Sequence, residues 1–128
     1  MTADPMSEKL RVEIFPADLD RTVDFYVRVF GFELLRDERH QQPPYVYMRR
    51  GEVRIGAVAH PGAVPECVRR PPVGVELVLE VGDLELERDR IVAAAWPLTD
   101  DIIRQPWGLR DFRLLDPDGY YWRITTAG

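Results

Sequence analysis

A tryptophan between a proline and a glycine is the residue of this sequence best suited to bind a flat molecule. Pro106 holds Trp107 on one side, and Gly108 on the other leaves the ring unobstructed. A rigid aromatic ring offers a large contact area at a low cost in conformational entropy. Tyr45 and Tyr47 share one face of a candidate strand and could form an opposing wall. The alternatives are a rim or dimer-interface position for the tryptophan and a packing role for the tyrosines.

Charged side chains share faces of three candidate strands and predict a polar surface. Arg11, Glu13 and Phe15 point to one side of their strand, because successive strand side chains alternate between faces. The same rule groups the side chains of two later strands: Glu76, Val78 and Glu80, and Tyr121, Arg123 and Thr125. A buried charge must be paired to offset its desolvation. We expect the ion pairs Arg11–Glu76 and Arg123–Glu13, direct contacts of these groups with a ligand, or both.

The overall composition limits the partners. The 128-residue chain carries a formal net charge of −5, which disfavours nucleic acids and anionic membranes and favours a cationic ligand. The glutamates of the predicted polar surface suit a cationic ligand, whereas its arginines do not. The single cysteine, Cys67, allows no internal disulfide. We expect a cytoplasmic protein without a membrane partner, because no apolar run approaches the ~20 residues of a membrane span and no signal pattern is visible.

The first part of the chain predicts a strand, a helix and three further strands. Residues 10–15 alternate as a half-buried strand does. Asp18 is a good N-cap, because its carboxylate can accept from free backbone N–H groups, and Gly31 suits the residue just after a helix. Four apolar residues recur between them at helical spacing: Leu19, Val23, Tyr26 and Phe30. The three further strands are expected at 33–36, 45–49 and 53–59.

The same order of elements recurs after a proline-rich segment, residues 60–72. Four prolines exclude both a helix and a central strand there. Residues 73–81 then predict a strand, and Asp83 is placed to cap a second helix. Further strands are expected near 98–104, 109–115 and 120–125, and a turn at 116–119.

The repeated order predicts the architecture. The repeats span about residues 9–60 and 73–126, and neither has enough apolar positions for a core of its own. We therefore predict a single domain over residues 9–126, preceded by a flexible segment 1–8. The predicted fold class is α+β: two βαβββ repeats form a curved mixed sheet with a concave cleft, and the helices lie on its outer face. Trp122 and the other apolar residues of the strands should pack on those helices.

Two motifs resemble the glyoxalase / bleomycin-resistance / extradiol-dioxygenase superfamily. The first is DLDRTVDFYVRVFGFELL at 18–35, and the second is PWGLRDFRLLDPDGYYWRI at 106–124. The second motif is similar in particular to the bleomycin-resistance proteins, which are metal-free binders that sequester an antibiotic, typically as dimers with two shared clefts. The resemblance covers residues 9–126. It implies the same fold, a homodimer, and contact of Trp107 with flat heteroaromatic parts of a ligand.

The resemblance also indicates where a metal would bind in the metal-dependent branches. Three of the ligand positions correspond to Arg11, Glu76 and Arg123. A guanidinium group has no lone pair to donate and repels a cation. The only histidines, His40 and His60, lie in predicted loops and cannot restore a two-histidine site. We therefore expect no metal and no cofactor; the alternative is a site built from the glutamates of the polar surface and a loop histidine.

Three functions follow from these observations. The leading one is a metal-free protein that binds an antibiotic or another planar natural product, by sequestration or self-resistance. Its predicted ligand-binding residues are Arg11, Glu13, Phe15, Tyr45, Tyr47, Glu76, Trp107 and Arg123. The alternative is an enzyme of the same fold, either a metal-dependent lyase, isomerase, thiol transferase or dioxygenase, or a metal-free enzyme with a glutamate base. The third is an accessory dimer whose cleft binds nothing.

Overall fold

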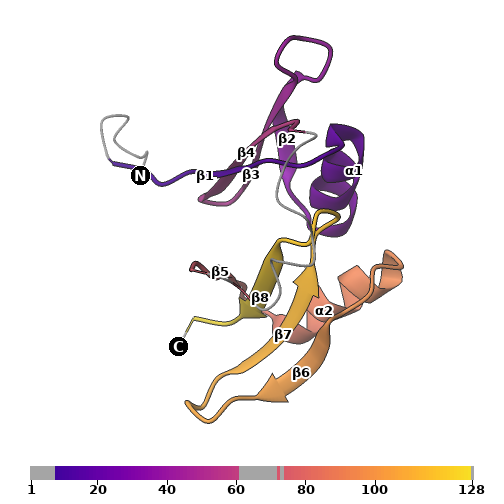
Figure 1. Cartoon of the computed structure of the whole chain (residues 1–128). Coiled ribbons are helices and arrows are strands. Elements are labelled where there is room, and N and C mark those ends of the chain that lie inside the picture. Colours follow the sequence, from indigo (N-terminus) through magenta and orange to yellow (C-terminus); the bar gives the residue numbers. More distant parts are fainter. Residues whose placement is uncertain (1–7, 61–71, 73, 128) are drawn as a thin grey trace.

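The doubled order of elements is confirmed by the computed structural model, which describes residues 8–60, 72 and 74–127 (Figure 1). The first half contains β1 (Val12–Ile14), α1 (Leu19–Val23), a π-helical continuation η1 (Asp24–Val29), β2 (Glu33–Glu38), β3 (Tyr45–Arg50) and β4 (Val53–Val58). The second contains β5 (Leu77–Glu80), α2 (Leu84–Ala93), β6 (Asp100–Arg104), β7 (Arg110–Leu115) and β8 (Tyr121–Thr125). Almost all of the predicted flexible segment 1–8 and of the linker 60–72, Cys67 included, lies outside the described residues.

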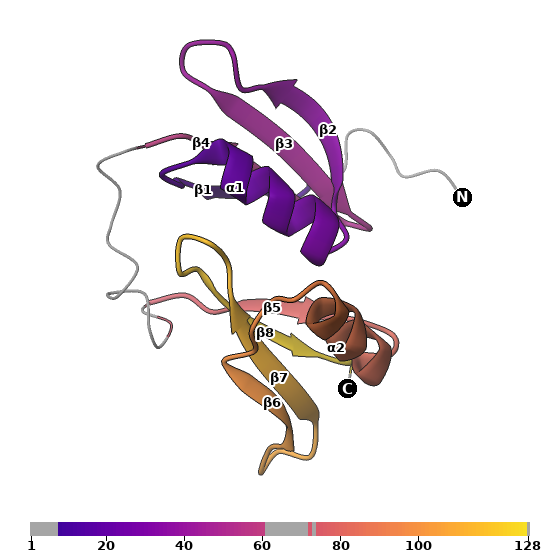
Figure 2. The same cartoon turned by 90° about the vertical axis from the view of Figure 1, so that its right-hand side faces the viewer.

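The strands form two mixed sheets, one in each half. Their orders are β1-β4-β3-β2 and β5-β8-β7-β6, with β1–β4 and β5–β8 parallel and the other neighbours antiparallel. The α+β class and the βαβββ repeat are therefore confirmed, and the described strands of the two halves share no backbone ladder. Both helices cover the same side of the molecule, at the right of Figure 1 and in front of the strands in Figure 2.

The helices begin at the aspartates that the sequence predicts as N-caps, whereas the middle of the first helix departs from the predicted regular α-helix. Asp18 Oδ1 accepts from the backbone N–H of residue 20 at 2.9 Å, and Asp83 Oδ1 accepts from that of residue 86 at 3.0 Å. From Asp24 the first helix widens into a π-helical turn, which ends with the Phe30 N–H bonded to the Phe25 carbonyl at 2.9 Å. The wider turn buries both Phe25 and its neighbour Tyr26, which a regular 3.6-residue period does not predict. Neither helix of the described chain is long and apolar enough to cross a membrane.

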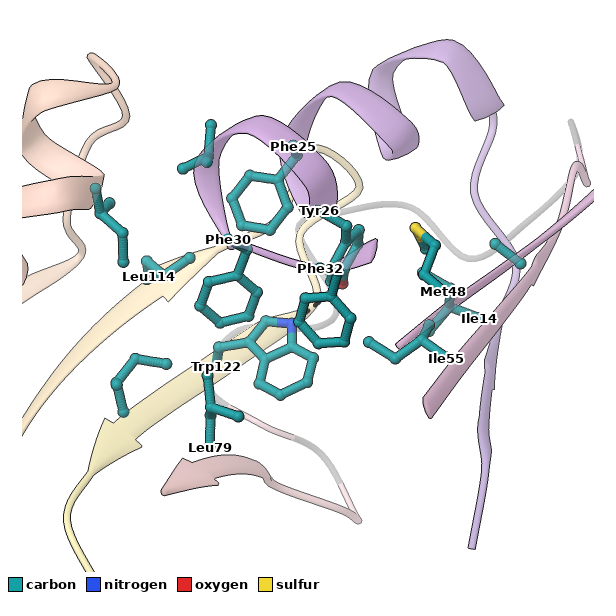
Figure 3. Close-up of a cluster of buried hydrophobic side chains, with 14 of the residues drawn as sticks. Ile14, Phe25, Tyr26, Phe30, Phe32, Met48, Ile55, Leu79, Leu114 and Trp122 are labelled. Atoms are coloured by element: carbon teal, nitrogen blue, oxygen red, sulfur yellow. Dashed lines mark hydrogen bonds between the residues drawn. The ribbon is translucent and has the colours of Figure 1, made fainter. Parts of the chain in front are cut away.

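The helix-facing sides of both sheets meet in one hydrophobic core (Figure 3). Trp122 is 3% exposed, as expected of a core residue, and it lies edge-on to Phe30 with ring centroids 5.1 Å apart. Ile14 and Met48 approach this aromatic cluster from the first sheet. Burial of one such large side chain contributes about 1.5–3 kcal/mol. The core is therefore common to the two halves and cannot be divided between them.

A buried carboxylate in the 116–119 turn of the second half is hydrogen-bonded to the first helix. Asp116 Oδ2 accepts from the Tyr26 hydroxyl at 2.7 Å, and Oδ1 accepts from the N–H groups of Asp118 and Tyr120 at 2.9 Å each. Burial raises the pKa of Asp116 to about 6, although these hydrogen bonds act in the opposite direction. Asp118 Oδ1 in turn accepts from the Ala17 N–H at 2.9 Å. The turn therefore positions the junction between β1 and α1.

An ion pair joins the halves on the helix side. Arg50 at the end of β3 donates to both carboxylate oxygens of Glu87 in α2, at 2.7 and 2.8 Å. The Glu87 side chain is 6% exposed, and loss of one partner would leave a buried charge uncompensated. This pair therefore fixes α2 against the first sheet.

Candidate functional site

Each sheet presents polar side chains on the side opposite its helix. Residues that are paired in neighbouring strands share a face, which places Glu13, Gly56, Tyr47 and Arg36 in one row. The first polar face comprises Arg11, Glu13, Arg36, Tyr45, Tyr47 and Gly56. The second polar face comprises Glu76, Val78, Glu80, Trp107, Asp111, Arg113, Tyr121 and Arg123. Seven of the eight predicted ligand-binding residues therefore belong to these two faces, whereas Phe15 follows β1 and its ring lies 6.3 Å from that of His60.

A carboxylate covers the centre of the first polar face. Glu13 Oε1 lies 2.8 Å from Arg11 Nε and accepts from the Tyr45 hydroxyl at 3.4 Å. A Cβ atom at Gly56 would collide with Glu13 Oε2 and would approach the Tyr45 hydroxyl to 2.5 Å. Gly56 is therefore the position that gives the carboxylate its space. Burial and the adjacent Glu13 raise the pKa of Tyr45.

An arginine occupies the centre of the second polar face. Arg123 Nε lies 2.8 Å from Glu76 Oε1, and Arg123 Nη1 lies 4.0 Å from Asp111 Oδ2. The Trp107 ring centroid is 5.7 Å from the guanidinium carbon of Arg123, within the range of a cation–π contact. Trp107 is 57% exposed, so most of its surface is accessible to another molecule.

The predicted ion pairs between the halves are wrong. Arg11 pairs with Glu13 in the first half, and Arg123 pairs with Glu76 in the second. The physical reason is the separation of the sheets: residues two apart on one strand, or on neighbouring strands, are close, whereas the halves share no ladder. Within the described residues, no ion pair joins the two polar faces.

Sequence reasoning missed the carboxylate beneath the second polar face. Asp111 is 2% exposed, and its Oδ1 accepts from Gln105 Nε2 at 2.9 Å. Arg113 follows two residues later on the same side of β7, where it is paired with Arg123 of the neighbouring strand β8. The signal was present in the sequence, because Asp111 and Arg113 alternate with apolar residues of the core.

The residues at the implied metal positions do not fit a metal. Arg11 and Arg123 carry guanidinium groups, which have no lone pair for a cation. The two sheets have equivalent strand pairings, and the position of Arg123 in the second sheet corresponds to Gly56 in the first. A glycine has no side-chain atom that could bind a metal. Glu76, the remaining carboxylate, faces Arg123. Across the ranges 8–60 and 74–127, no three His, Cys, Asp or Glu side chains are grouped as a metal site.

Comparisons with known proteins agree with this architecture. Residues 10–124 match the Glyoxalase/Bleomycin resistance protein/Dioxygenase superfamily, whereas no curated protein matches the chain. TioX from Micromonospora sp. ML1 is similar in structure, with a TM-score of 0.74, 26% identity, and coverage of 94% of this chain and 98% of that one. The bleomycin resistance determinant encoded on transposon Tn5 has a TM-score of 0.74 at 22% identity, over 94% and 98% of the two chains.

A structure of a bleomycin-binding protein complexed with bleomycin is also similar, with a TM-score of 0.73 and 22% identity. The match covers 95% of this chain and 100% of that chain. The family match extends over nearly all of the described elements, from β1 to β8. The chain therefore belongs to the glyoxalase/bleomycin resistance protein/dioxygenase superfamily.

Proposed function

We propose that this protein binds a planar aromatic natural product, such as an antibiotic, without a metal, and acts by sequestration. The observation that carries the proposal is the exposed Trp107 ring, held against Arg123 at the second polar face. An aromatic ring that a folded protein leaves accessible beside polar groups is suited to stack on a flat ligand. The similar bleomycin-binding protein, complexed with bleomycin, supports small-molecule binding within the family.

The polar faces favour binding over catalysis. Glu13 and Glu76, two of the three glutamates of the polar faces, each face an arginine at 2.8 Å. A base must be free to accept the proton of a substrate. Metal-dependent chemistry would require donor atoms at the positions that Arg11, Gly56 and Arg123 occupy.

The same ion pairs change the expected character of the ligand. A cationic ligand was expected because glutamates are numerous in the predicted polar surface. Glu13 and Glu76 each face an arginine in the structure, so each carboxylate already has a cationic partner, although Glu13 Oε2 accepts no hydrogen bond within the described residues. The proposal therefore retains the planar ring and no longer favours a positively charged ligand over a neutral or anionic one.

We further propose that the protein acts as a homodimer. Strands β1, β2, β5 and β6 are the edges of their sheets within the described chain, and open edges are usually covered in native proteins. A second copy of the chain would cover some of these edge strands and would place a protein surface in front of each polar face. Light scattering during size-exclusion chromatography measures the mass, and a strictly monomeric protein would contradict this part of the proposal.

Tryptophan fluorescence tests the binding proposal. Titration of the protein with bleomycin and daunorubicin should quench the emission, and Trp107→Ala should weaken binding about tenfold, which corresponds to about 1.4 kcal/mol. The matched control is Trp96→Phe, because Trp96 packs on Phe25 at the helix side with ring centroids 4.8 Å apart. Equal affinity of the Trp107→Ala variant and the wild type would contradict the proposal. Affinity that is lost with a chelator and restored by a divalent metal would favour the metal-dependent alternative.

A further inference from the structure

Two arginines lie side by side on the second polar face, where the carboxylates Glu76 and Asp111 offset part of their charge. Arg113 in β7 and Arg123 in β8 are directly paired across the antiparallel ladder. Like charges at such positions repel one another. Both side chains are only 22% exposed, so water screens the repulsion incompletely. The arrangement therefore requires an explanation beyond surface solubility.

The hydrogen-bond donors of this pair are almost unused. A guanidinium group has five N–H donors. Within the described chain, Arg113 makes one hydrogen bond, from Nη1 to the Tyr121 hydroxyl at 3.3 Å. The buried Nε of Arg123 has no hydrogen-bond partner there, although Glu76 Oε1 lies 2.8 Å away as an ion-pair contact. A mostly buried donor without a hydrogen-bond partner is costly, so the carboxylates of this face, Glu76 and Asp111, do not fully satisfy the two guanidinium groups.

The nearest buried carboxylate does not supply a hydrogen-bond acceptor to either group. Asp111 Oδ2 lies 3.7 Å from Arg113 Nη2 and 4.0 Å from Arg123 Nη1, beyond hydrogen-bond distance. Its other oxygen, Oδ1, is engaged by Gln105. Asp111 therefore offsets part of the positive charge but makes no hydrogen bond to either guanidinium group within the described residues.

The fold itself does not demand arginine at these positions. The corresponding register positions of the first sheet are Tyr47 and Gly56, which are paired with each other in the same way. The first half forms the same β-sheet with neither charge. The arginine pair is therefore a feature of the second polar face alone and not of the repeated frame.

We propose that Arg113 and Arg123 form a receptor for an oxyanion, such as the carboxylate, sulfate or phosphate group of a ligand whose ring stacks on Trp107. The planar fork of each guanidinium matches two oxygens of such a group. Trp107 lies next to Arg123, so a ring and an anionic substituent can be bound together. This inference rests on the proposed binding function and specifies the chemistry of the ligand.

Three probes with one ring system and different charges test the inference. We expect 2-naphthoate to bind at least tenfold more tightly than 2-naphthamide or 2-naphthylmethylammonium. Arg113→Met and Arg123→Met should each reduce the affinity for 2-naphthoate to that for 2-naphthamide. Glu76→Gln should strengthen binding of 2-naphthoate, because it removes the carboxylate that competes for Arg123. A site for a cation would show the opposite response to this variant.

Controls separate the anion site from folding and from net charge. Arg104→Met is the matched control, because Arg104 is exposed and register places it on the other side of β6; its affinity for 2-naphthoate should equal that of the wild type. Arg113→Lys and Arg123→Lys keep the positive charge but lose the planar guanidinium group with its paired N–H donors. These variants should therefore retain only part of the preference for 2-naphthoate over 2-naphthamide. Thermal unfolding of each variant establishes that it is folded.

The outcomes distinguish this inference from the binding proposal on which it rests. Equal affinity for the three naphthalene probes would overturn the oxyanion receptor and leave planar-ligand binding intact. Inorganic sulfate that shifts the Nε–H resonances of Arg113 and Arg123, while no naphthalene compound binds, would support the receptor and overturn the binding proposal. If neither sulfate nor any naphthalene probe binds, both are overturned.

Discussion

The two sides of the sheets use the same strands for different purposes. On the helix-covered side, residues of both halves merge into one core around Trp122 and Tyr26 (Figure 3). On the other side, the two polar faces diverge: Glu13 lies over Gly56 in the first, whereas Arg123 occupies that register position in the second. The repeat therefore determines the frame and leaves the chemistry of each face free to differ.

The contrast between the two sides also separates stability from binding. Trp122 and Trp107 are 15 residues apart in the sequence numbering, yet one is 3% exposed and the other 57%. A buried ring contributes to folding because it leaves water, whereas an exposed ring keeps its surface for a partner. Substitutions on the two sides should therefore have different effects.

The largest effect is expected at the shared core. Trp122→Ala should lower the free energy of unfolding by about 3–5 kcal/mol, since it removes a buried aromatic ring and leaves a cavity. Trp107→Ala, on the exposed side, should change it by less than about 1 kcal/mol. Urea unfolding followed by circular dichroism measures both values. Similar losses in the two variants would contradict the division of the molecule into a core side and a binding side.

The next effect is a pH dependence of the free energy of unfolding, which arises from Asp116 at the junction between the halves. The pKa of Asp116 is raised to about 6 in the folded protein, so the folded state holds this proton more tightly than the unfolded chain does. The contribution of Asp116 to stability is therefore complete below the unfolded pKa of about 4, and it is lost as the pH rises through about 6. A shift of this size corresponds to about 3 kcal/mol.

Asp116→Asn isolates that contribution, because asparagine does not titrate. The free energy of unfolding of the wild type, relative to that of the variant, should fall between about pH 4 and about pH 7. Urea unfolding of the two proteins at several pH values measures the difference. A constant difference over this range would show that Asp116 keeps an ordinary pKa in the junction.

A smaller effect distinguishes the two polar faces. Gly56→Ala should reduce the free energy of unfolding by about 1–3 kcal/mol, because the new methyl group collides with the Glu13 carboxylate. Gly82→Ala is the matched control, since a Cβ there meets no atom within 4 Å; we expect a change within about 0.5 kcal/mol.

A double variant identifies why Gly56→Ala lowers the free energy of unfolding. If the carboxylate is the obstacle, Glu13→Ala combined with Gly56→Ala should be more stable than the sum of the single effects predicts, as contacting residues are not additive. Denaturant unfolding of the four proteins completes the cycle. Strict additivity would mean that Gly56 is required for the strand itself and not for the space above it.

The sequence by itself determined the elements and the sides of each strand. Asp18 and Asp83 marked the helix starts through their capping chemistry, and alternation assigned Trp122 to the core. These features depend on local hydrogen bonding and on periodicity, which act over a few residues. The π-helical turn was not predicted; its buried rings, Phe25 and Tyr26, pack on Trp96 and Trp122, which are distant in the sequence.

Only the tertiary structure decided which charges meet. The residues of the polar faces were predicted by type and by side, but their pairing was not, since pairing depends on which strands lie next to each other. Arg11 therefore pairs with Glu13 and Arg123 with Glu76. The adjacency of Arg113 and Arg123 likewise follows from the register of β7 and β8. An ion pair is a short-range contact in space. Periodicity assigns a residue to one face of its strand, but it does not say which strands become neighbours.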